Sequence, residues 1–170
     1  ENPSYEIFRN SSFSISASSD DWKEKLVDQL PESVAYIFKA AIERFNTIEE
    51  DVLLRRLYAY LLNITMPDFD LLIVDEAHNF KHGTQGEVSY RNQVVSRLMG
   101  VIYAEDEVIF REFPELKAKL KPLSGKVILL SATPLDNGVY EIANQLDCFL
   151  PVHPYRNLET EAKSKKIKED

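Results

Sequence analysis

The spacing of apolar residues predicts that the first part of the chain is helical. Between residues 32 and 46, and again after Thr47 to about Ile64, apolar side chains recur at the i, i+3, i+4 and i+7 positions of amphipathic helices. A shorter helix with the same pattern is predicted after residue 20, and Pro31 interrupts it. The positions predicted to face a core are Trp22, Leu26, Leu30, Val34, Ile37, Phe38, Ala41, Ile42, Phe45, Leu54, Leu57, Tyr58, Leu61 and Leu62.

Two pairs of residues have the spacing of a capping box. In that motif a small polar side chain and an acidic side chain three positions later each bind the other's backbone N–H group. Asp21 and Glu24 stand in this relation at the start of the first helix, and Thr47 and Glu50 at the start of the third. The sequence therefore predicts a helix start at both places, and the Met66-Pro67 step is predicted to end the third helix.

Two apolar runs without alternation lie further along the chain. Residues 71–74 and 127–130 contain only Leu, Ile and Val, which is typical of parallel strands that are buried on both faces. The stretch between them is long enough for a crossover that contains helix. The first run ends in Asp75-Glu76 and the second in Ser131-Ala132-Thr133. Because open α/β sheets bind ligands at the carboxyl ends of their strands, these residues are predicted to meet at one site.

The two acids after the first run suit phosphate chemistry. An acid at the end of such a strand commonly holds Mg²⁺ beside the phosphates of a nucleotide, and a second acid can orient the attacking water. The alternative is structural, since Asp75 would also serve as the N-cap of a helix that follows the strand. This segment alone leaves both interpretations open.

The sequence around these residues resembles a known family. Asp75-Glu76-Ala77-His78 and Ser131-Ala132-Thr133 are similar to motifs II and III of superfamily-two helicase-like ATPases. Two details narrow the resemblance. Lys81 falls three residues after His78, and Thr133-Pro134-Leu135-Asp136-Asn137 matches the Thr-Pro-Leu-x-Asn run of Swi/Snf-like DNA translocases.

The resemblance covers about residues 68–151 and implies a role for each motif residue. It implies the distal part of the first RecA-like domain of an ATPase that moves on nucleic acid. In such an enzyme Asp75 holds Mg²⁺, usually through water, and Glu76 polarises the water that attacks ATP. The implied partners are duplex DNA and a second RecA-like domain. The residues implied to relay the nucleotide state to the nucleic-acid side are His78, Ser131, Ala132 and Thr133.

The expected fold class is α/β, as a partial RecA-like, three-layer domain with a mainly parallel sheet and an added helical segment. Residues 1–154 are predicted to form this domain, with the helical segment at 20–64, and residues 155–170 a charged tail or linker. The family usually has another strand before the strand with the acids, so the helices over 33–64 are a departure. These helices either form an inserted docking surface or pack against the back of the sheet.

Further helices are predicted on both sides of the second strand. They lie over residues 93–103, around 114–120, and after Asp136-Asn137, whereas the polar stretch 79–92 is predicted to be a loop. The inner face predicted for the last helix consists of Val139, Ile142, Ala143, Leu146 and Leu150.

A phosphate-binding loop is missing from the sequence. Nucleotide-binding folds of this kind need a glycine-rich loop that ends in Gly-Lys-Ser or Gly-Lys-Thr between a strand and a helix. Of the five glycines, only Gly125 precedes a lysine, and the predicted strand follows at once. The chain is therefore expected to be one part of a larger ATPase, inactive by itself, with ATP and Mg²⁺ bound in the complete protein.

The charge of the chain limits what it is expected to bind alone. Its net charge is −8 and its pI about 5.0, whereas affinity for DNA depends largely on Lys and Arg that neutralise phosphates. Four lysines between residues 117 and 126 come closest to a basic cluster, but their spacing is typical of a solvent-exposed helix face. Most of the residues that bind nucleic acid in the complete protein are therefore expected to lie outside this chain. The residues of that nearest cluster are Lys117, Lys119, Lys121 and Lys126.

The sequence also indicates the compartment. It has neither an apolar run of membrane-span length nor the pattern of a signal peptide, so no membrane partner is expected. Cys148 is the single cysteine, which excludes an intrachain disulfide framework. A cytoplasmic location is expected, at the nucleoid in a bacterium or in the nucleus of a eukaryote.

Two other classes of function are compatible with parts of the sequence. A zinc hydrolase is suggested by His78-x-x-x-His82, with help from Glu76 and His153, although Asn79 stands where that motif has Glu. A non-catalytic α/β module that binds a protein partner is the second alternative. Because a truncated sheet exposes an unpaired edge, self-association of the chain is a further expectation.

Overall fold

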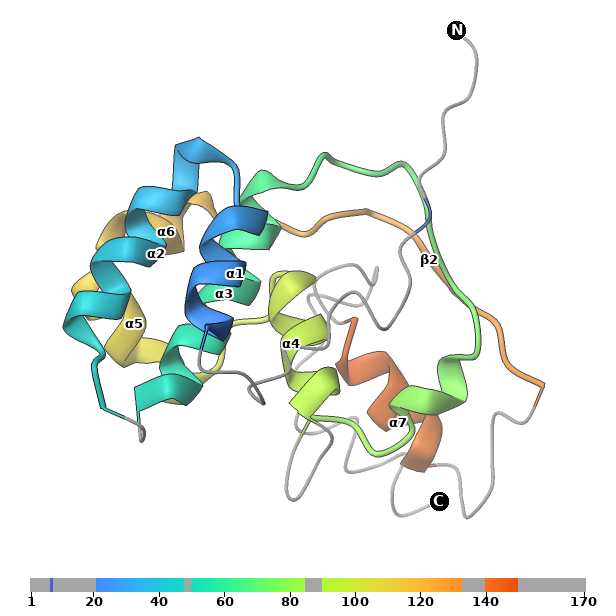
Figure 1. Ribbon diagram of the computed structural model, residues 1–170. Coiled ribbons are helices and arrows are strands. Elements are labelled where there is room, and N and C mark those ends of the chain that lie inside the picture. Colours follow the sequence, from blue (N-terminus) through green and yellow to red (C-terminus); the bar gives the residue numbers. More distant parts are fainter. Residues whose placement is uncertain (1–6, 8–20, 48–49, 85–89, 133–139, 150–170) are drawn as a thin grey trace, which may run out of the picture.

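The computed structural model describes residue 7 and residues 21–47, 50–84, 90–132 and 140–149. Helices make up most of this part of the chain, and two short strands lie side by side at one end of it (Figure 1). In chain order the elements are α1 (Trp22–Gln29), α2 (Glu32–Arg44), α3 (Asp51–Thr65), β1 (Leu72–Val74), the 3-10 helix η3 (Ala77–Phe80), α4 (Tyr90–Leu98), the 3-10 helix η4 (Ala104–Asp106), α5 (Glu107–Glu112), α6 (Pro114–Lys119), β2 (Val127–Leu129) and α7 (Tyr140–Asp147).

The first three helices form where the apolar spacing predicts them. Pro31 lies between α1 and α2 with the extended conformation φ −57°, ψ 147°, and Met66 ends α3 in the same way. Of the two predicted capping boxes, one is confirmed: Thr47 N donates to Glu50 Oε2 at 3.2 Å and Glu50 N to Thr47 Oγ1 at 3.3 Å. The other is wrong, because the side chain of Asp21 caps no N–H of α1. It forms an ion pair with Lys25 instead.

The apolar faces of α1, α2 and α3 pack together and against α5 and α6, and we call this cluster the helical core. Phe38, Leu57 and Leu116 are completely buried in it, and the ring of Phe38 meets that of Tyr58 edge-on at 5.9 Å. The core positions predicted from the sequence are confirmed, with Ile42 and Leu62 half-buried at its border. Figure 1 shows these helices on the side of the molecule away from the strands.

The two strands pair in parallel, as the sequence predicts. The register joins Leu72 to Val127, Ile73 to Ile128 and Val74 to Leu129. The chain is therefore of mixed α/β type, with a parallel sheet of two strands in the described residues. One face of this sheet packs on a second apolar cluster, which we call the sheet core. Its buried members are Phe80, Val95, Leu98, Met99, Leu123, Cys148 and Phe149.

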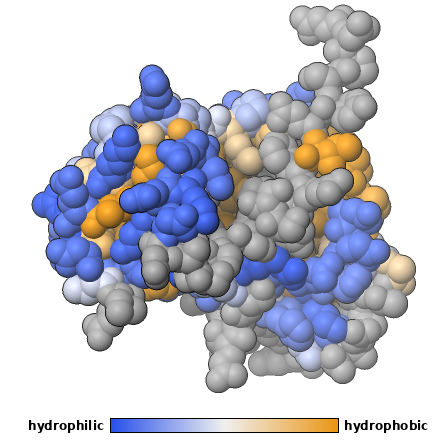
Figure 2. Space-filling model, viewed as in Figure 1, coloured by the Kyte–Doolittle hydropathy of each residue, from blue (hydrophilic) through white to orange (hydrophobic). Residues whose placement is uncertain are grey.

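The prediction that both faces of the strands are buried is wrong. Leu72 and Val74 point towards the sheet core, but the neighbouring Ile73 is 56% exposed and Ile128, its partner in the register, is 44% exposed. Figure 2 shows hydrophobic surface over the strands. The helices over 33–64 therefore do not cover this exposed face: α2 packs on α1 and α3, and α3 packs mainly on α4 and α2.

The later helices agree only partly with the sequence. Helix α4 begins at Tyr90, inside the stretch 79–92 that was predicted to be a loop, and ends at Leu98 rather than near residue 103. Helix α6 lies where it was predicted, whereas α5 was not predicted. In α7 the predicted inner face is partly wrong: Ile142 is exposed, while Glu141 and Gln145 are buried. Ala143 is buried as expected. Two further members of that predicted face, Val139 and Leu150, lie outside the described residues.

Gly100 ends α4 in a conformation that requires glycine. Its φ is +97°, and a Cβ atom built there would lie 2.5 Å from the backbone oxygen of Lys121. The buried side chain of Asn63 fixes both segments, because its Nδ2 donates to Leu98 O and to Lys121 O, each at 2.8 Å. The backbone oxygen therefore has little freedom to move away.

Gly100→Ala is expected to lower the free energy of unfolding by about 2–3 kcal/mol, since left-handed strain and a forced contact each cost about 1 kcal/mol or more. Chemical denaturation of the purified chain measures this change. Gly125→Ala is the matched control, because no heavy atom lies within 4 Å of the position of its Cβ. Equal stabilities of the two variants would contradict the strain assigned to Gly100.

No helix in the described part of the chain combines the length and the apolar character needed to cross a bilayer.

Cys148 is buried in the sheet core, and burial raises the pKa of its thiol to about 12. A protonated, inaccessible thiol is a poor nucleophile. Cys148 therefore acts as a small apolar side chain.

Candidate functional site

The pairing of the strands brings the two polar strand ends together. Beyond the last paired residues, Leu130 N donates to Val74 O and Ala77 N donates to Leu130 O, both at 2.8 Å. Asp75 and Ser131 therefore leave the sheet at the same edge. The prediction that the acids and the hydroxyl residue meet at one edge is confirmed for the described residues.

Glu76 adopts a left-handed backbone conformation, with φ 53° and ψ 44°. It is the one described non-glycine residue with a positive φ, and this conformation costs roughly 1–2 kcal/mol. Hydrogen bonds hold it in place: Glu76 N donates to Asp75 Oδ1 at 2.9 Å, and both N and Nδ2 of Asn79 donate to Glu76 O at 3.0 Å. Strain that is maintained in this way is characteristic of functional sites.

His78 contacts both of the groups that the strand ends provide. Its Nδ1 lies 3.1 Å from Glu76 Oε2 and 3.4 Å from Ser131 Oγ. A single ring nitrogen donates one proton, so the carboxylate, which is closer and charged, is the stronger acceptor. Because both groups face the same nitrogen, the trio lacks the geometry of a Ser-His-acid nucleophile, in which the serine and the acid bind opposite nitrogens of the ring.

The carboxylates of this site are open to solvent. The side chain of Glu76 is 58% exposed and that of His78 33%, and Asp75 is also exposed. Asp75 uses Oδ1 to accept the N–H of Glu76, which leaves its other oxygen for a ligand. Exposed carboxylate oxygens suit a hydrated Mg²⁺, because this ion keeps several waters and is usually bound through one or two carboxylates.

Other site residues predicted from the sequence take less part in this geometry. Ala132 is exposed beside Ser131, and both Thr133 and His153 lie outside the described residues. His82 follows the end of η3 and is exposed, so it does not share an α-helical face with His78. Among the described residues no group of three or more potential ligand side chains gathers to hold a metal ion.

Helix α4 holds the segment that follows the acids. Arg91, in its first turn, donates from Nη2 to Asn79 O at 3.0 Å, and its guanidinium lies 5.7 Å from the centroid of the Phe80 ring. Phe80 in turn meets Phe149 edge-on in the sheet core at 5.2 Å. A buried aromatic anchor and a charged donor therefore fix η3 together.

Amide side chains fix the next few residues of the same segment. Asn92 Nδ2 donates to Gly83 O and Asn144 Nδ2 donates to Lys81 O, both at 2.9 Å. Gly83 has φ +66° and lies against Asn144, which leaves little room for a Cβ. These supporting residues were missed by the sequence analysis, since nothing in the local pattern marks an asparagine of α4 or α7 as a partner of the loop after His78.

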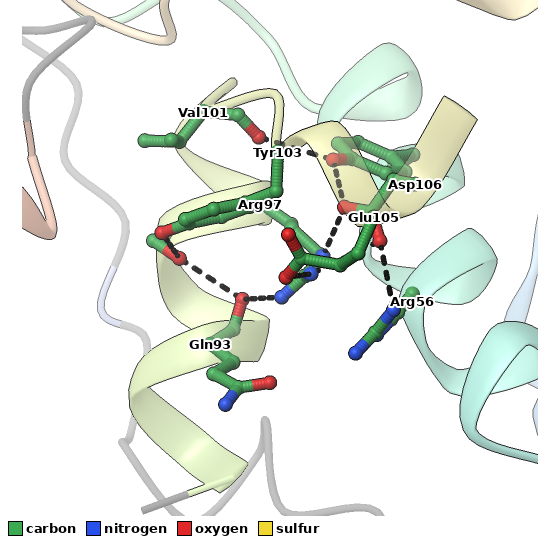
Figure 3. A network of polar contacts seen from close by, with 9 residues as sticks. Arg56, Gln93, Arg97, Val101, Tyr103, Glu105 and Asp106 are labelled. Atoms are coloured by element: carbon green, nitrogen blue, oxygen red, sulfur yellow. Dashed lines mark hydrogen bonds and ion pairs between the residues drawn. The ribbon is translucent and has the colours of Figure 1, made fainter. Parts of the chain in front are cut away.

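A buried polar network joins α4 to the helical core. Arg97 and Asp106 are 1% and 0% exposed, and they form a two-bonded ion pair at 2.6 Å (Nε–Oδ2) and 3.0 Å (Nη2–Oδ1). Tyr60 of α3 donates its hydroxyl to Asp106 Oδ2 at 2.6 Å, and Arg56 Nη1 lies 3.3 Å from Asp106 Oδ1. Figure 3 shows Arg56, Arg97 and Asp106 converging from α3, α4 and η4.

The network also changes the proton affinity of its members. Burial, with Asp106 adding to it, raises the pKa of the Tyr60 hydroxyl far above its usual range. Burial alone would lower the pKa of Arg97, but the paired Asp106 carboxylate outweighs it, so this pKa is raised. Both groups therefore stay protonated at neutral pH, and the network is a fixed link between the two cores.

Comparisons with protein-family models, with curated proteins and with solved structures find no match for this chain.

Proposed function

We propose that this chain is the distal part of the first RecA-like domain of a Swi/Snf-like ATPase, which couples ATP hydrolysis to movement on duplex DNA. The observation that carries the proposal is the parallel pairing of β1 with β2, which brings Glu76, His78 and Ser131 into contact. In this proposal the phosphate-binding loop and the second RecA-like domain are provided by sequence outside these 170 residues.

The exposed carboxylates define the chemistry of the proposed site. Asp75, with one oxygen free, would hold Mg²⁺. That ion would supply charge stabilisation for the transferred phosphoryl group. Glu76 accepts the proton of the attacking water as a general base. Hydrogen bonds fix its left-handed backbone, while its exposed side chain is able to turn from His78 to the attacking water.

The shared nitrogen of His78 provides the link to the nucleic-acid side. Before the attacking water binds, the Glu76 carboxylate accepts the Nδ1 proton of His78. When Glu76 turns to the attacking water, the same proton becomes available to Ser131 Oγ, which already lies 3.4 Å away. The state of the nucleotide thereby changes the hydrogen bonds of the segment after β2.

Phosphate release by the complete protein, with Mg–ATP and with or without duplex DNA, tests this proposal. We expect turnover that DNA stimulates. Ser131→Ala, alone and together with Thr133→Ala, is expected to leave hydrolysis intact and to reduce translocation per ATP. Absence of ATP turnover in the complete protein would overturn the proposal, and unchanged coupling in these variants would remove the relay from it.

The exposed face of the sheet favours a second candidate. Apolar side chains of both strands are open to solvent there, and an exposed apolar patch commonly marks an interaction surface. A non-catalytic α/β module that binds a protein partner is compatible with this face. The ATPase assay separates the two candidates, since only the first requires turnover.

A further inference from the structure

Basic side chains gather where α1, α3 and α4 meet, outside the site described above. The guanidinium carbon of Arg55 is 5.0 Å from the centroid of the Trp22 ring and 5.4 Å from that of the Tyr90 ring. Contact with two aromatic rings holds the guanidinium and leaves the edges of its plane for other partners. No carboxylate of the described residues forms an ion pair with Arg55.

The surroundings of Arg55 carry a surplus of positive charge. Arg55, Arg56 and Arg97 all act on the Tyr90 hydroxyl: burial raises its pKa to about 12, and each of the three guanidinium groups lowers it. Two carboxylates pair with these arginines. Asp106 binds Arg97 through two hydrogen bonds and also lies 3.3 Å from Arg56, and Glu105 pairs with Arg97. The surplus is notable in a chain of net charge −8.

Several donors in this group have no acceptor. Nε of Arg55 and Nε of Arg56 are buried without a hydrogen-bond partner among the described residues. The Tyr90 hydroxyl is buried as well, and its arginine neighbours offer only N–H groups, so its proton also lacks an acceptor. Buried donors are nearly always satisfied in folded proteins, and exceptions commonly mark a bound water or ion.

We propose that Arg55, Arg56 and Tyr90 form a binding site for a phosphate group. Arginine forks bind phosphate oxygens through paired hydrogen bonds, and a tyrosine hydroxyl is a common additional donor. The site draws on more than one guanidinium, which favours a phosphate group, with its several acceptor oxygens, over a single carboxylate. The unpartnered donors themselves are buried, but the three residues are each partly exposed, so we expect a phosphate group to reach the donors after a small rotation of these side chains. The phosphate belongs either to a small molecule or to a nucleic-acid backbone.

The fluorescence of Trp22 tests the proposal directly, because Trp22 is the single tryptophan of the chain and touches Arg55. Titration of the purified chain with pyrophosphate, at constant ionic strength, is expected to change this fluorescence in a saturable way. Arg55→Gln is expected to raise the apparent Kd about 10- to 100-fold, as loss of charged hydrogen bonds commonly does. Arg111→Gln, at an exposed position of α5, is the matched control and is expected to bind as the unaltered chain does.

A parallel titration with a short single-stranded oligonucleotide identifies the source of the phosphate. Binding of pyrophosphate alone assigns the site to a small molecule, whereas binding of both probes assigns it to a nucleic-acid backbone. A rise in the melting temperature with pyrophosphate, absent in Arg55→Gln, provides a second readout that does not depend on the local fluorescence. No saturable change with either probe, or equal binding by Arg55→Gln, would overturn the proposal. This test involves neither ATP nor the Glu76 site, so its outcome is independent of the proposed ATPase.

Discussion

Glu76→Gln is expected to lower the rate of ATP hydrolysis by the protein that contains this chain by about 10²- to 10⁴-fold, the usual contribution of a general base. Glutamine keeps the size of the side chain, and its carbonyl oxygen still accepts the Nδ1 proton of His78. It accepts no proton from water, however, so the chemical step is lost while nucleotide binding persists. Single-turnover hydrolysis and titration with a fluorescent nucleotide measure the two quantities separately.

A control for this prediction is available on α2. Glu43 is exposed, and Glu43→Gln makes the same chemical change far from the strands in the sequence, so hydrolysis is expected to proceed at the original rate. If Glu76→Gln also hydrolyses ATP at that rate, Glu76 has no part in the mechanism. If it loses nucleotide binding as well, the residue acts in binding rather than in proton transfer.

Asp106→Asn is expected to lower the free energy of unfolding by about 3–5 kcal/mol, because it removes the buried carboxylate that pairs with Arg97 and leaves the half-exposed Glu105 as the remaining counter-charge. Asn keeps the shape of the side chain but carries no charge, and one of its two terminal atoms is a donor facing Arg97, Arg56 or Tyr60. Urea denaturation of the purified chain measures the loss. A change of this size is a large fraction of the stability of an ordinary domain.

The neighbouring residue provides the control for Asp106. Glu107 forms an ion pair with Lys117 at 3.2 Å, but both side chains are at least half exposed, at 58% and 50%. Exposed pairs contribute only about 0–1 kcal/mol. Glu107→Gln is therefore expected to be nearly neutral. If Asp106→Asn is as stable as Glu107→Gln, the network of Figure 3 does not hold the two cores together.

Local pattern was enough to predict the elements that carry the site. The runs 71–74 and 127–130 are entirely apolar and half β-branched, and they end in polar residues, so both the strands and the edge at which they meet follow from the sequence. The part of the helical core that comes from α1, α2 and α3 was also predictable, since its residues repeat with the period of a helix, whereas the part from α5 was not predicted. Thr47 with Glu50 added a correct helix start.

Features that depend on contacts between distant segments were not predictable. The exposure of Ile73 depends on what lies over the sheet, which the strand's own composition does not record. The inner face of α7 was misjudged because Glu141 and Gln145 are buried despite their polarity, against the rule that polar residues lie outside. The sequence also gave no sign that Arg97 is buried. Its burial depends on the ion pair with Asp106, and that pair forms only when α4 and η4 pack together.

The first three helices and the two strands also differ in how far apart the contacting segments lie along the chain. Helices α1, α2 and α3 follow one another and meet through short connections, whereas β1 and β2 pair only after the chain has passed through α4, η4, α5 and α6. Closing a long loop costs entropy before any contact repays it, so pairing of this kind forms slowly. The carboxylates and the hydroxyl of the site are therefore assembled late in folding, on a scaffold of helices that is already in place.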